Sequence, residues 1–354
     1  TCGGSTTIRA TSELSEAQGK KPPFGGFTTR RPTEFDHVFQ SPGPIYEPGR
    51  IEGDWWRLGR FMHAAGVGHG DIVQNCFAYH LTPAGMMFDS AARAVGAAVL
   101  PAGTGQTELQ VRAAADIGTT CYAGTPDYLK VILDKADEMG EALAFTRAVM
   151  GGGALFPSLR QAYADRGILT LQCYATADLG SIAYESEAME GMIVDEGVIV
   201  EIVRPGTGDP VPEGEVGEVV VTTLNPDYPL IRFATGDLSA AMPGTSPCGR
   251  TNMRIRGWMG RADQTAKIKG MFVRPEQVAQ LVARHPDVSR ARVIADRRDE
   301  MDVMVVQLET KGENPALYEA SVLEALKLKG RVELVAPGSL PNDGKVIEDR
   351  RTYG

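Results

Sequence analysis

Strand-like and helix-like segments alternate between residues 71 and 173, and this alternation restricts the possible folds more than any other feature of the chain. The apolar strand expected at Asp71–Phe77 is followed by a helix at Pro83–Val95 and a strand at Ala97–Leu100. Strands that alternate with helices of about 10–15 residues form a mostly parallel sheet with helices on both faces, and ligands bind at the carboxyl ends of its strands. The other expected segments are the helices Thr107–Ile117, Pro126–Met139 and Pro157–Arg166, the strands Thr119–Ala123, Thr146–Met150 and Ile168–Cys173, and a first helix from about residue 52 with Trp55, Leu58, Gly59 and Met62.

The pattern changes twice after Cys173. Val198–Val203 and Glu218–Thr223 are expected strands separated by a turn-rich segment, which indicates a β-rich part. A helix that starts at Pro275 then opens a small α+β unit. We therefore expect an α/β protein with a large N-terminal domain at residues 1–262, which has mostly parallel sheets and a β-rich subdomain, and a small C-terminal α+β domain at residues 263–354. In the small domain we expect strands at Ala291–Ala295, Val303–Leu308 and Arg331–Val335 and a second helix at Leu317–Leu328.

The charge and cysteine content limit the partners and the compartment. The chain has 36 Lys and Arg against 45 Asp and Glu, for a net charge of -9, which argues against a nucleic-acid or anionic-membrane surface. Five cysteines without a Cys-x-x-Cys pair indicate a reducing cytoplasm. No run of about 18 apolar residues is present, so we expect no membrane-spanning helix.

Two segments suit the sugar and phosphate parts of a nucleotide. Pro229–Leu238 is interpreted as an apolar strand that ends in a Thr-Gly-Asp turn, where the carboxylate of Asp237 can accept two hydrogen bonds from a vicinal diol. Taken alone, the segment is more consistent with an ordinary Asx-turn than with a ligand site. Gly257–Gln264 lies at the composition break, where a hinge is expected and Arg261 can reach a nucleotide.

Two further segments lie at the expected ligand edge of the sheet. Gly151-Gly152-Gly153-Ala154 joins a strand to a helix and permits close approach of a planar ligand. In Gln172–Gly180, Tyr174 can stack on a base and Asp178 can hold a metal ion. Near the C-terminus, Gly338–Lys345 forms a turn-dense loop with one lysine at its tip.

Together these segments resemble the adenylate-forming ligases, and specifically the phenylacetate–coenzyme A ligase-like branch. Leu100–Glu108 is similar to the Pro-x-Gly-x-Gly-x-Thr-Glu of that branch, and Ala123–Tyr128 is similar to its Gly-Thr-Pro-Ser-Tyr. The resemblance implies a two-step reaction in which a carboxylic acid and ATP form an acyl-adenylate and coenzyme A then displaces AMP, with Mg²⁺ as cofactor. It also implies that the small C-terminal domain moves between the two steps.

The resemblance assigns roles to individual residues. Lys345 matches the mobile catalytic lysine, which neutralises charge as the adenylate forms, and Asp263 matches the hinge. Asp178 would be the Mg²⁺ ligand. The nucleotide site would comprise Gly152, Gly153, Ala154, Tyr174, Ala175, Asp237 and Arg261, and the acid pocket Tyr79, His80, Pro83, Ala84 and Gly85. His80 is equally consistent with a satisfied core residue. Apolar side chains in that pocket suit an aromatic acid such as phenylacetate.

Two motifs depart from the family pattern. The Ser-Gly-Thr-Thr-Gly-x-Pro loop that holds the ATP phosphates should precede the first long helix, but Gln40–Gly49 occupies that place. Its prolines have no N–H to donate, and Glu47 repels phosphate. In the motif Tyr-Gly-x-Thr-Glu, Ala177 replaces the threonine and Asp178 the glutamate.

The favoured function is therefore an ATP-dependent acid–coenzyme A ligase of the cytoplasm, acting on small molecules and not on nucleic acid or membranes. Two alternatives stay open: a non-catalytic nucleotide- or acyl-CoA-binding homologue, and an adenylating enzyme that passes its acyl group to a carrier protein or an amine. A homodimer is also open, because Pro22–Thr29 and Pro42–Gly49 suit packing against a partner subunit as well as facing ATP.

Overall fold

The chain forms two compact units. The computed structural model describes residues 9–42, 44–153, 155–262, 264, 266–268, 271–298 and 301–351. Unit 1 contains the described residues of 1–200, 221–233 and 242–258, and unit 2 those of 201–220, 234–241 and 259–354. Unit 2 thus includes two segments that come before the C-terminal part of the chain. The domain boundary expected between residues 262 and 263 stays a prediction.

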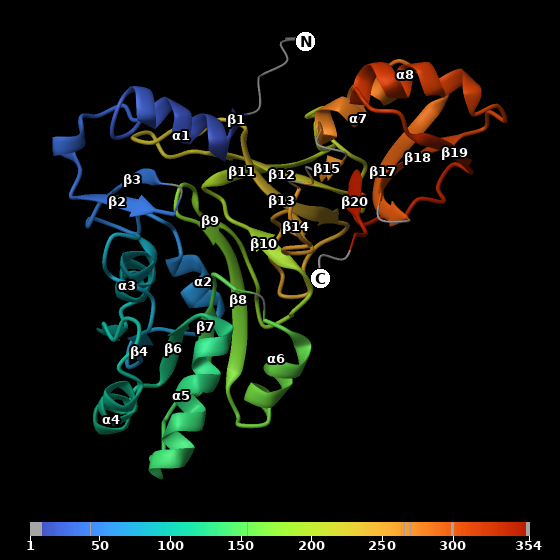
Figure 1. The fold of residues 1–354 in the computed structure, drawn as a ribbon. Helices are drawn as coiled ribbons and strands as arrows, with labels where there is room; N and C mark the ends of the chain where they lie inside the picture. The colour runs from blue at the N-terminus through green and yellow to red at the C-terminus, as the bar shows by residue number, and fades with distance from the viewer. Residues whose placement is uncertain are drawn as a thin grey trace. The chain divides into compact units, whose positions relative to one another are not determined.

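Unit 1 is built on the parallel sheet that the strand–helix alternation predicts (Figure 1). Neighbouring strands are parallel from β5 to β8, which confirms this part of the fold. The sheet then becomes antiparallel through β9, β10 and β14, which are short strands between turns that the sequence pattern did not reveal. In spatial order the strands are β5 (Ala98–Leu100), β4 (Ile72–Asn75), β6 (Cys121–Gly124), β7 (Arg147–Met150), β8 (Leu169–Thr176), β9 (Gly180–Tyr184), β10 (Met192–Val194) and β14 (Arg254–Ile255).

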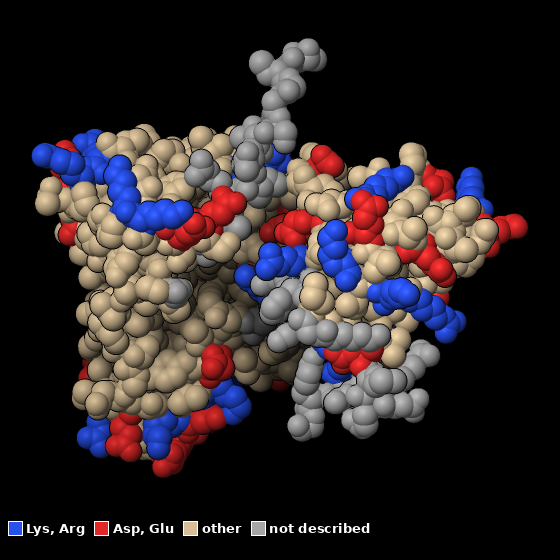
Figure 2. Space-filling model, turned by 45° about the horizontal axis from the view of Figure 1, so that its top comes forward, with Lys and Arg blue, Asp and Glu red and all other residues tan. Residues whose placement is uncertain are grey.

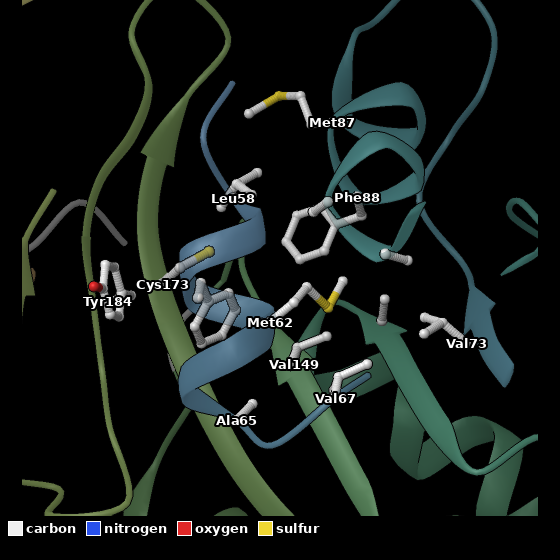
Figure 3. Packing of buried hydrophobic residues seen from close by; sticks show 14 of the residues in the cluster. Leu58, Met62, Ala65, Val67, Val73, Met87, Phe88, Val149, Cys173 and Tyr184 are labelled. Atoms are coloured by element: carbon white, nitrogen blue, oxygen red, sulfur yellow. The ribbon is translucent and has the colours of Figure 1, made fainter. Parts of the chain in front are cut away.

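Helices cover both faces of this sheet, because successive side chains of a strand point to opposite faces. Val149 of β7 packs with helices α2 (Gly59–Ala64) and α3 (Ala84–Ala94), and Figure 3 shows Met62 and Phe88 in this cluster. Met150, the next residue, packs on the other face. The helices there are α4 (Thr107–Ile117), α5 (Pro126–Met139) and α6 (Pro157–Ala164).

The first helix of this region is shorter than the sequence predicts. Trp55 and Leu58 precede α2, which begins at Gly59. The Asp54 carboxylate accepts a hydrogen bond of 2.6 Å from the Gly59 N–H, and an acceptor placed there satisfies a free amide at the helix start. The apolar spacing from residue 55 therefore reflects burial of a turn followed by a helix.

The N-terminal part of unit 1 contains elements that the sequence analysis did not expect. Helix α1 (Thr11–Lys20) precedes the one-turn 3-10 helix η1 (Pro32–Glu34). The proline-rich segment is a β-hairpin, in which β2 (His37–Ser41) pairs antiparallel with β3 (Ile45–Gly49). The Glu47 side chain lies on β3 and is buried. At the expected position of a phosphate-binding loop, the described residues thus form two paired strands.

Unit 2 contains the expected small α+β fold. Its four-stranded sheet has the order β19 (Arg331–Val335), β18 (Met301–Thr310), β17 (Val288–Arg298) and β20 (Ile347–Asp349). Helices α7 (Pro275–Ala283) and α8 (Ala316–Leu326) pack on it through a shared apolar core. A separate hairpin pairs β15 (Ala266–Ile268) with β16 (Met271–Val273).

The Thr-Gly-Asp segment lies inside a strand and not in a turn, which corrects the sequence interpretation. The strands β11 (Val198–Val203), β12 (Val216–Thr223) and β13 (Phe233–Met242) are neighbours in that order. Asp237 lies in the middle of β13, and Gly236 before it has a φ of 72°. The Thr235 hydroxyl donates a hydrogen bond of 2.9 Å to the Val219 carbonyl of β12. The glycine therefore adapts a continuing strand instead of ending it.

The molecular surface carries both signs of charge. On the face shown in Figure 2, Lys and Arg side chains are interspersed with Asp and Glu side chains. The described residues of this face therefore form no extended surface of one sign. Within the part of the chain that the structure describes, no helix is long and apolar enough to cross a membrane.

Candidate functional site

A pocket of about 640 Å³ in unit 1 lies at the carboxyl ends of β7 and β8, where a parallel sheet is expected to bind its ligand. Gly152 and Gly153 follow β7, and Tyr174 and Ala175 lie near the end of β8. All four line the pocket, which thus unites the described residues predicted to surround the nucleotide base. Gly152 has a φ of 69°, a conformation that favours glycine. Ala154 lies outside the described residues.

The walls of this pocket combine exposed apolar side chains with a fixed ion pair. Phe156 and Trp258 line it with exposed fractions of 65% and 52%. Arg160 forms two hydrogen bonds of 2.8 and 2.9 Å with the Glu185 carboxylate, which also accepts one of 2.8 Å from the Gln172 N–H. The Arg256 side chain also lines the pocket, so its walls carry one arginine beyond the Arg160–Glu185 pair. Sequence reasoning missed this pair because its members come from different elements.

Two of the residues predicted for the acid pocket, Tyr79 and Gly85, contact the buried side chain of Asn75. Its amide donates hydrogen bonds of 2.7 Å to the Tyr79 hydroxyl and 2.8 Å to the Gly85 carbonyl. Only glycine fits at position 85, because a Cβ there would lie 2.6 Å from the Ala78 carbonyl oxygen. Burial raises the pKa of the Tyr79 phenol, so this hydroxyl is neutral. Asn75 itself was not predicted, since its role depends on these two contacts.

The remaining predicted acid-pocket residues differ in burial. Pro83 is buried, Ala84 is half-buried and His80 is exposed. The alternative of His80 as a core residue is therefore wrong.

An aromatic pair lies beneath the glycine segment. The rings of Phe77 and Phe88 stack with centroids 4.3 Å apart. A Cβ on Gly151 would lie 3.5 Å from Phe88 and 3.9 Å from Phe77, and 3.2 Å from the Cys173 sulfur. Figure 3 shows Phe88 and Cys173 in this cluster. The ligand edge of the sheet thus rests on an apolar, aromatic layer.

Asp178, the predicted metal ligand, lies in the turn between β8 and β9. Burial raises the pKa of its carboxyl to about 6, and the oxygen Oδ1 is buried without a hydrogen-bond partner. An orphaned carboxylate oxygen is a suitable ligand for a hard cation such as Mg²⁺, so the donor type at this position fits the metal. Among the described residues, no group of three or more His, Cys, Asp and Glu side chains is arranged to hold a metal ion.

Asp237 and Arg261 form an ion pair in unit 2. The Arg261 Nη1 lies 2.9 Å from the Asp237 carboxylate and also donates a hydrogen bond of 3.3 Å to the Thr235 carbonyl. A Cβ on Gly236 would lie 2.6 Å from the Arg261 guanidinium, so glycine lets the arginine cross the strand. The carboxylate is almost buried, whereas the Arg261 side chain is 57% exposed. The pair therefore holds Asp237 in place and leaves a cation open to an anionic ligand.

Lys345 is exposed in the loop before β20, and the Gln264 side chain fixes this loop. Gln264 donates a hydrogen bond of 2.9 Å to the Gly344 carbonyl and accepts one of 2.8 Å from the Ile347 N–H. Lys345 and Arg261 line the same small pocket of about 140 Å³ within unit 2. Gln264 was not predicted, since its contacts join residues some eighty positions apart in the sequence. Asp263, the predicted hinge, lies outside the described residues.

No protein-family model matches the chain. The chain is 30% identical to the phenylacetate–coenzyme A ligase of Thermus thermophilus over 293 residues, which cover 78% of this chain and 66% of that protein. It is 28% identical to the phenylacetate–coenzyme A ligase of Aromatoleum evansii over 324 residues, which cover 85% of this chain and 73% of the relative. The alignments with two further phenylacetate–coenzyme A ligases, from Pseudomonas putida and Escherichia coli, span 61% and 60% of those proteins.

Solved structures of similar fold include an open conformation of 2-hydroxyisobutyryl-CoA ligase in complex with 2-HIB-AMP and CoA. The TM-score is 0.69 at 23% sequence identity, and the match covers 95% of this chain and 79% of that one. The same ligase in its postadenylation state matches with a TM-score of 0.68. These likenesses establish the fold: a large mixed sheet with helices and a smaller C-terminal sheet domain.

Proposed function

This chain belongs to the phenylacetate–coenzyme A ligase-like branch of the adenylate-forming superfamily, and from that premise we propose that it is an ATP-dependent carboxylic acid–coenzyme A ligase. The observation that carries the proposal is the pocket of about 640 Å³ at the carboxyl ends of β7 and β8. Gly152, Gly153 and Tyr174 line it, and these are the residues that the sequence predicts for the nucleotide base.

In the first half-reaction, an oxygen of the acid attacks the α-phosphorus of ATP and pyrophosphate leaves. Tyr174 stacks on the adenine, the glycine segment lies beneath the base, and Asp237 accepts hydrogen bonds from the ribose hydroxyls. Arg261 supports the ribose and phosphate region. Lys345 offsets the negative charge on the carboxylate and the α-phosphate as they approach. Mg²⁺, held with the help of Asp178, would supply further charge neutralisation at the phosphates.

In the second half-reaction, the thiol of coenzyme A attacks the acyl carbonyl, and AMP leaves as a thioester forms. Asp263 is the proposed hinge for the domain movement between the two steps. The hinge position suits a residue that absorbs a large change in backbone angles.

An aromatic acid is the proposed substrate class. The stacked pair Phe77–Phe88 lies beneath the glycine segment, and Tyr79, Gly85 and Asn75 form a polar edge next to it. An aromatic ring gains both apolar burial and ring stacking in such surroundings. Pro83, Ala84 and His80 complete the proposed acid pocket.

A second candidate is a non-catalytic nucleotide- or acyl-CoA-binding homologue. It is favoured by the β2–β3 hairpin, which has prolines and the buried Glu47 at the expected place of the phosphate-binding loop. A third candidate, transfer of the acyl group to a carrier protein or an amine, differs only in the second half-reaction.

The cytoplasm is the proposed compartment, because five cysteines without a Cys-x-x-Cys pair suit a reducing environment. The proposed partners are the small-molecule acid and coenzyme A. A homodimer is an additional proposal, and light scattering of the purified protein tests it.

Product formation tests the proposed function. Purified protein is incubated with ATP, Mg²⁺, coenzyme A and a panel of aromatic, heteroaromatic and short-chain acids, and AMP and acyl-CoA are quantified by mass spectrometry. The proposal predicts AMP and thioester in equal amounts with at least one aromatic acid. AMP without thioester, with acyl transfer to an added amine, would favour the third candidate. Binding of AMP without any turnover would favour the second.

A further inference from the structure

The loop that carries Lys345 is held by two different sets of contacts within unit 2. The first set comes from the small α+β fold itself. The Glu309 carboxylate on β18 accepts a hydrogen bond of 2.7 Å from the Leu340 N–H. The Arg290 guanidinium on β17 donates one of 3.2 Å to the Pro341 carbonyl. The loop leads into β20, which pairs with β17, so these contacts belong to one sheet and persist wherever that sheet lies.

The second set joins the loop to a segment far away in the sequence. The Asn342 Oδ1 accepts a hydrogen bond of 3.0 Å from the Val216 N–H at the start of β12. The Asn342 Nδ2 donates one of 3.1 Å to the Gly214 carbonyl, 128 positions away in the sequence. Gly214 is itself fixed to β13, since its N–H donates a hydrogen bond of 3.1 Å to the Ala241 carbonyl. The amide thus uses both its oxygen and its nitrogen to attach the loop to a fixed strand end.

Gly344 brings the same two segments into close contact. It has a φ of 68°, and a Cβ there would lie 2.6 Å from a methyl carbon of Val216 and 3.1 Å from one of Leu238 on β13. The loop approaches the strands this closely because the residue is glycine. In this arrangement Lys345 and Arg261 line the same small pocket. The contacts with β12 and β13 therefore place the lysine next to the arginine proposed to support the ribose and phosphate region.

We propose that Asn342 is a positioning residue that holds Lys345 in place for adenylation and has no part in the thioester-forming step. This inference rests on the proposed function, in which the small C-terminal domain moves between the two half-reactions. Gly214 and Val216 precede the predicted domain boundary and Asn342 follows it, so the two hydrogen bonds break when the domain moves. The amide therefore stabilises only the arrangement in which Lys345 lies beside Arg261.

The geometry requires an amide at this position. A carboxylate accepts hydrogen bonds but donates none, so Asn342→Asp would turn an oxygen toward the Gly214 carbonyl oxygen. Asn342→Ala would take away the partner of the Val216 N–H, and Val216 is buried. Leaving a buried amide without a partner costs more free energy than a typical hydrogen bond contributes. Both substitutions should therefore release the loop from β12.

Separate measurement of the two half-reactions tests the inference. The exchange of labelled pyrophosphate into ATP reports adenylation, and thioester formation from a supplied acyl-adenylate and coenzyme A reports the second step. Asn342→Ala should slow the exchange by roughly tenfold or more, because two hydrogen bonds are lost, and leave thioester formation at the wild-type rate. Asn342→Asp should be impaired in the same way. The control Gln280→Ala removes an exposed amide from α7 and should leave both rates unchanged.

Amide hydrogen exchange tests the contact itself without any substrate. It is followed by mass spectrometry of peptides that contain Val216. In Asn342→Ala, but not in Gln280→Ala, the Val216 N–H should exchange roughly tenfold faster than in the wild type. Equal exchange in the wild type and Asn342→Ala would overturn the inference, and so would an equal slowing of both half-reactions, which indicates general damage to the fold. A wild type that forms no acyl-adenylate would contradict the proposed function, and unchanged protection of Val216 in the variant would separately overturn the contact.

Discussion

The glycine segment Gly151–Gly153 and the hairpin Gln40–Gly49 occupy places where the family pattern puts nucleotide-binding segments, but they have opposite physical properties. The glycine segment follows β7, lies above the apolar ring pair and leaves its backbone accessible at a pocket. The hairpin pairs its backbone in a two-stranded sheet and buries Glu47. Two N–H groups of the hairpin that face away from the partner strand are also occupied: Gln40 donates to the Leu81 carbonyl and Tyr46 to the Gln18 side chain, each at 2.8 Å.

The two ends of the proposed nucleotide site therefore differ in how much of the family's residue pattern they keep. The groups proposed for the base and ribose, Tyr174 and Asp237, retain the residue types that the chemistry needs. The groups proposed for the outer phosphates have lost backbone donors and gained a carboxyl group. Binding of adenosine and handling of pyrophosphate are therefore separable, and four variants or measurements can sharpen or break this comparison.

Replacement of Lys345 should have the largest effect. Lys345→Ala removes the cation proposed to neutralise charge during adenylation. We expect the activation free energy to rise by about 3–4 kcal/mol, which slows the reaction by two to three decades. The rate of AMP formation with the preferred acid measures it. Lys329→Ala, an exposed lysine of the same unit, is the matched control and should keep the wild-type rate. Equal rates for both variants would remove Lys345 from the mechanism.

Replacement of Tyr174 tests the retained end of the site. Stacking of an aromatic side chain on a base contributes about 1–3 kcal/mol, so Tyr174→Ala should weaken AMP binding by roughly 5- to 150-fold. Calorimetric titration with AMP gives the affinity. Tyr174→Phe keeps the ring and should bind AMP almost as well as the wild type. An unchanged affinity of Tyr174→Ala would mean that the base lies elsewhere.

Substitutions in the glycine segment should have a smaller effect, on stability, and Gly153 serves as the control for Gly152. Gly152 has a φ of 69°, so Gly152→Ala should destabilise the fold by about 1–2 kcal/mol through backbone strain alone, since its nearest neighbour atom lies 3.7 Å away. Gly153 has no such angle, and its nearest neighbour lies 3.4 Å away, so Gly153→Ala should change the stability much less. Urea unfolding of both variants measures the difference. Equal destabilisation would show that the conformation of Gly152 is not required.

The smallest expected effect is the difference in affinity between ATP and AMP, which tests the hairpin Gln40–Gly49. If the hairpin offers no phosphate cradle, ATP without Mg²⁺ should bind no more than about threefold more tightly than AMP, a difference under 1 kcal/mol. Parallel calorimetric titrations in chelator-treated buffer provide the comparison. A preference of tenfold or more for ATP would mean that the hairpin or a neighbouring segment still binds the outer phosphates.

The sequence predicts helices and strands well where the conformational preferences of neighbouring residues determine them. Helix α5 runs from Pro126 to Met139 as expected, because proline suits the first helical turn and Gly140 adopts the left-handed conformation that ends a helix. Helix α4 also has the predicted bounds, Thr107–Ile117. The parallel strands follow from the same alternation of apolar segments.

The sequence did not predict features that depend on contacts between residues far apart in the chain. The roles of Asn75 and Gln264 depend on partners that only the fold brings near. The prolines of Gln40–Gly49 predict a loop, but this segment belongs to a hairpin that cross-strand pairing and the packing of Phe39 on Trp56 stabilise. The Thr-Gly-Asp sequence predicts a turn at Asp237, whereas pairing with β12 keeps β13 extended through this residue. The sequence therefore identified candidate site residues, but it did not predict the contacts that surround them.

The exchange of labelled pyrophosphate into ATP, with Mg²⁺, an aromatic acid and no coenzyme A, tests the central claim most directly, because it reports formation of the acyl-adenylate alone. The account predicts exchange that requires the acid and Mg²⁺ and falls by two to three decades in Lys345→Ala. No exchange with any acid, in protein that still binds AMP, would contradict the account and identify a nucleotide-binding homologue without adenylation activity.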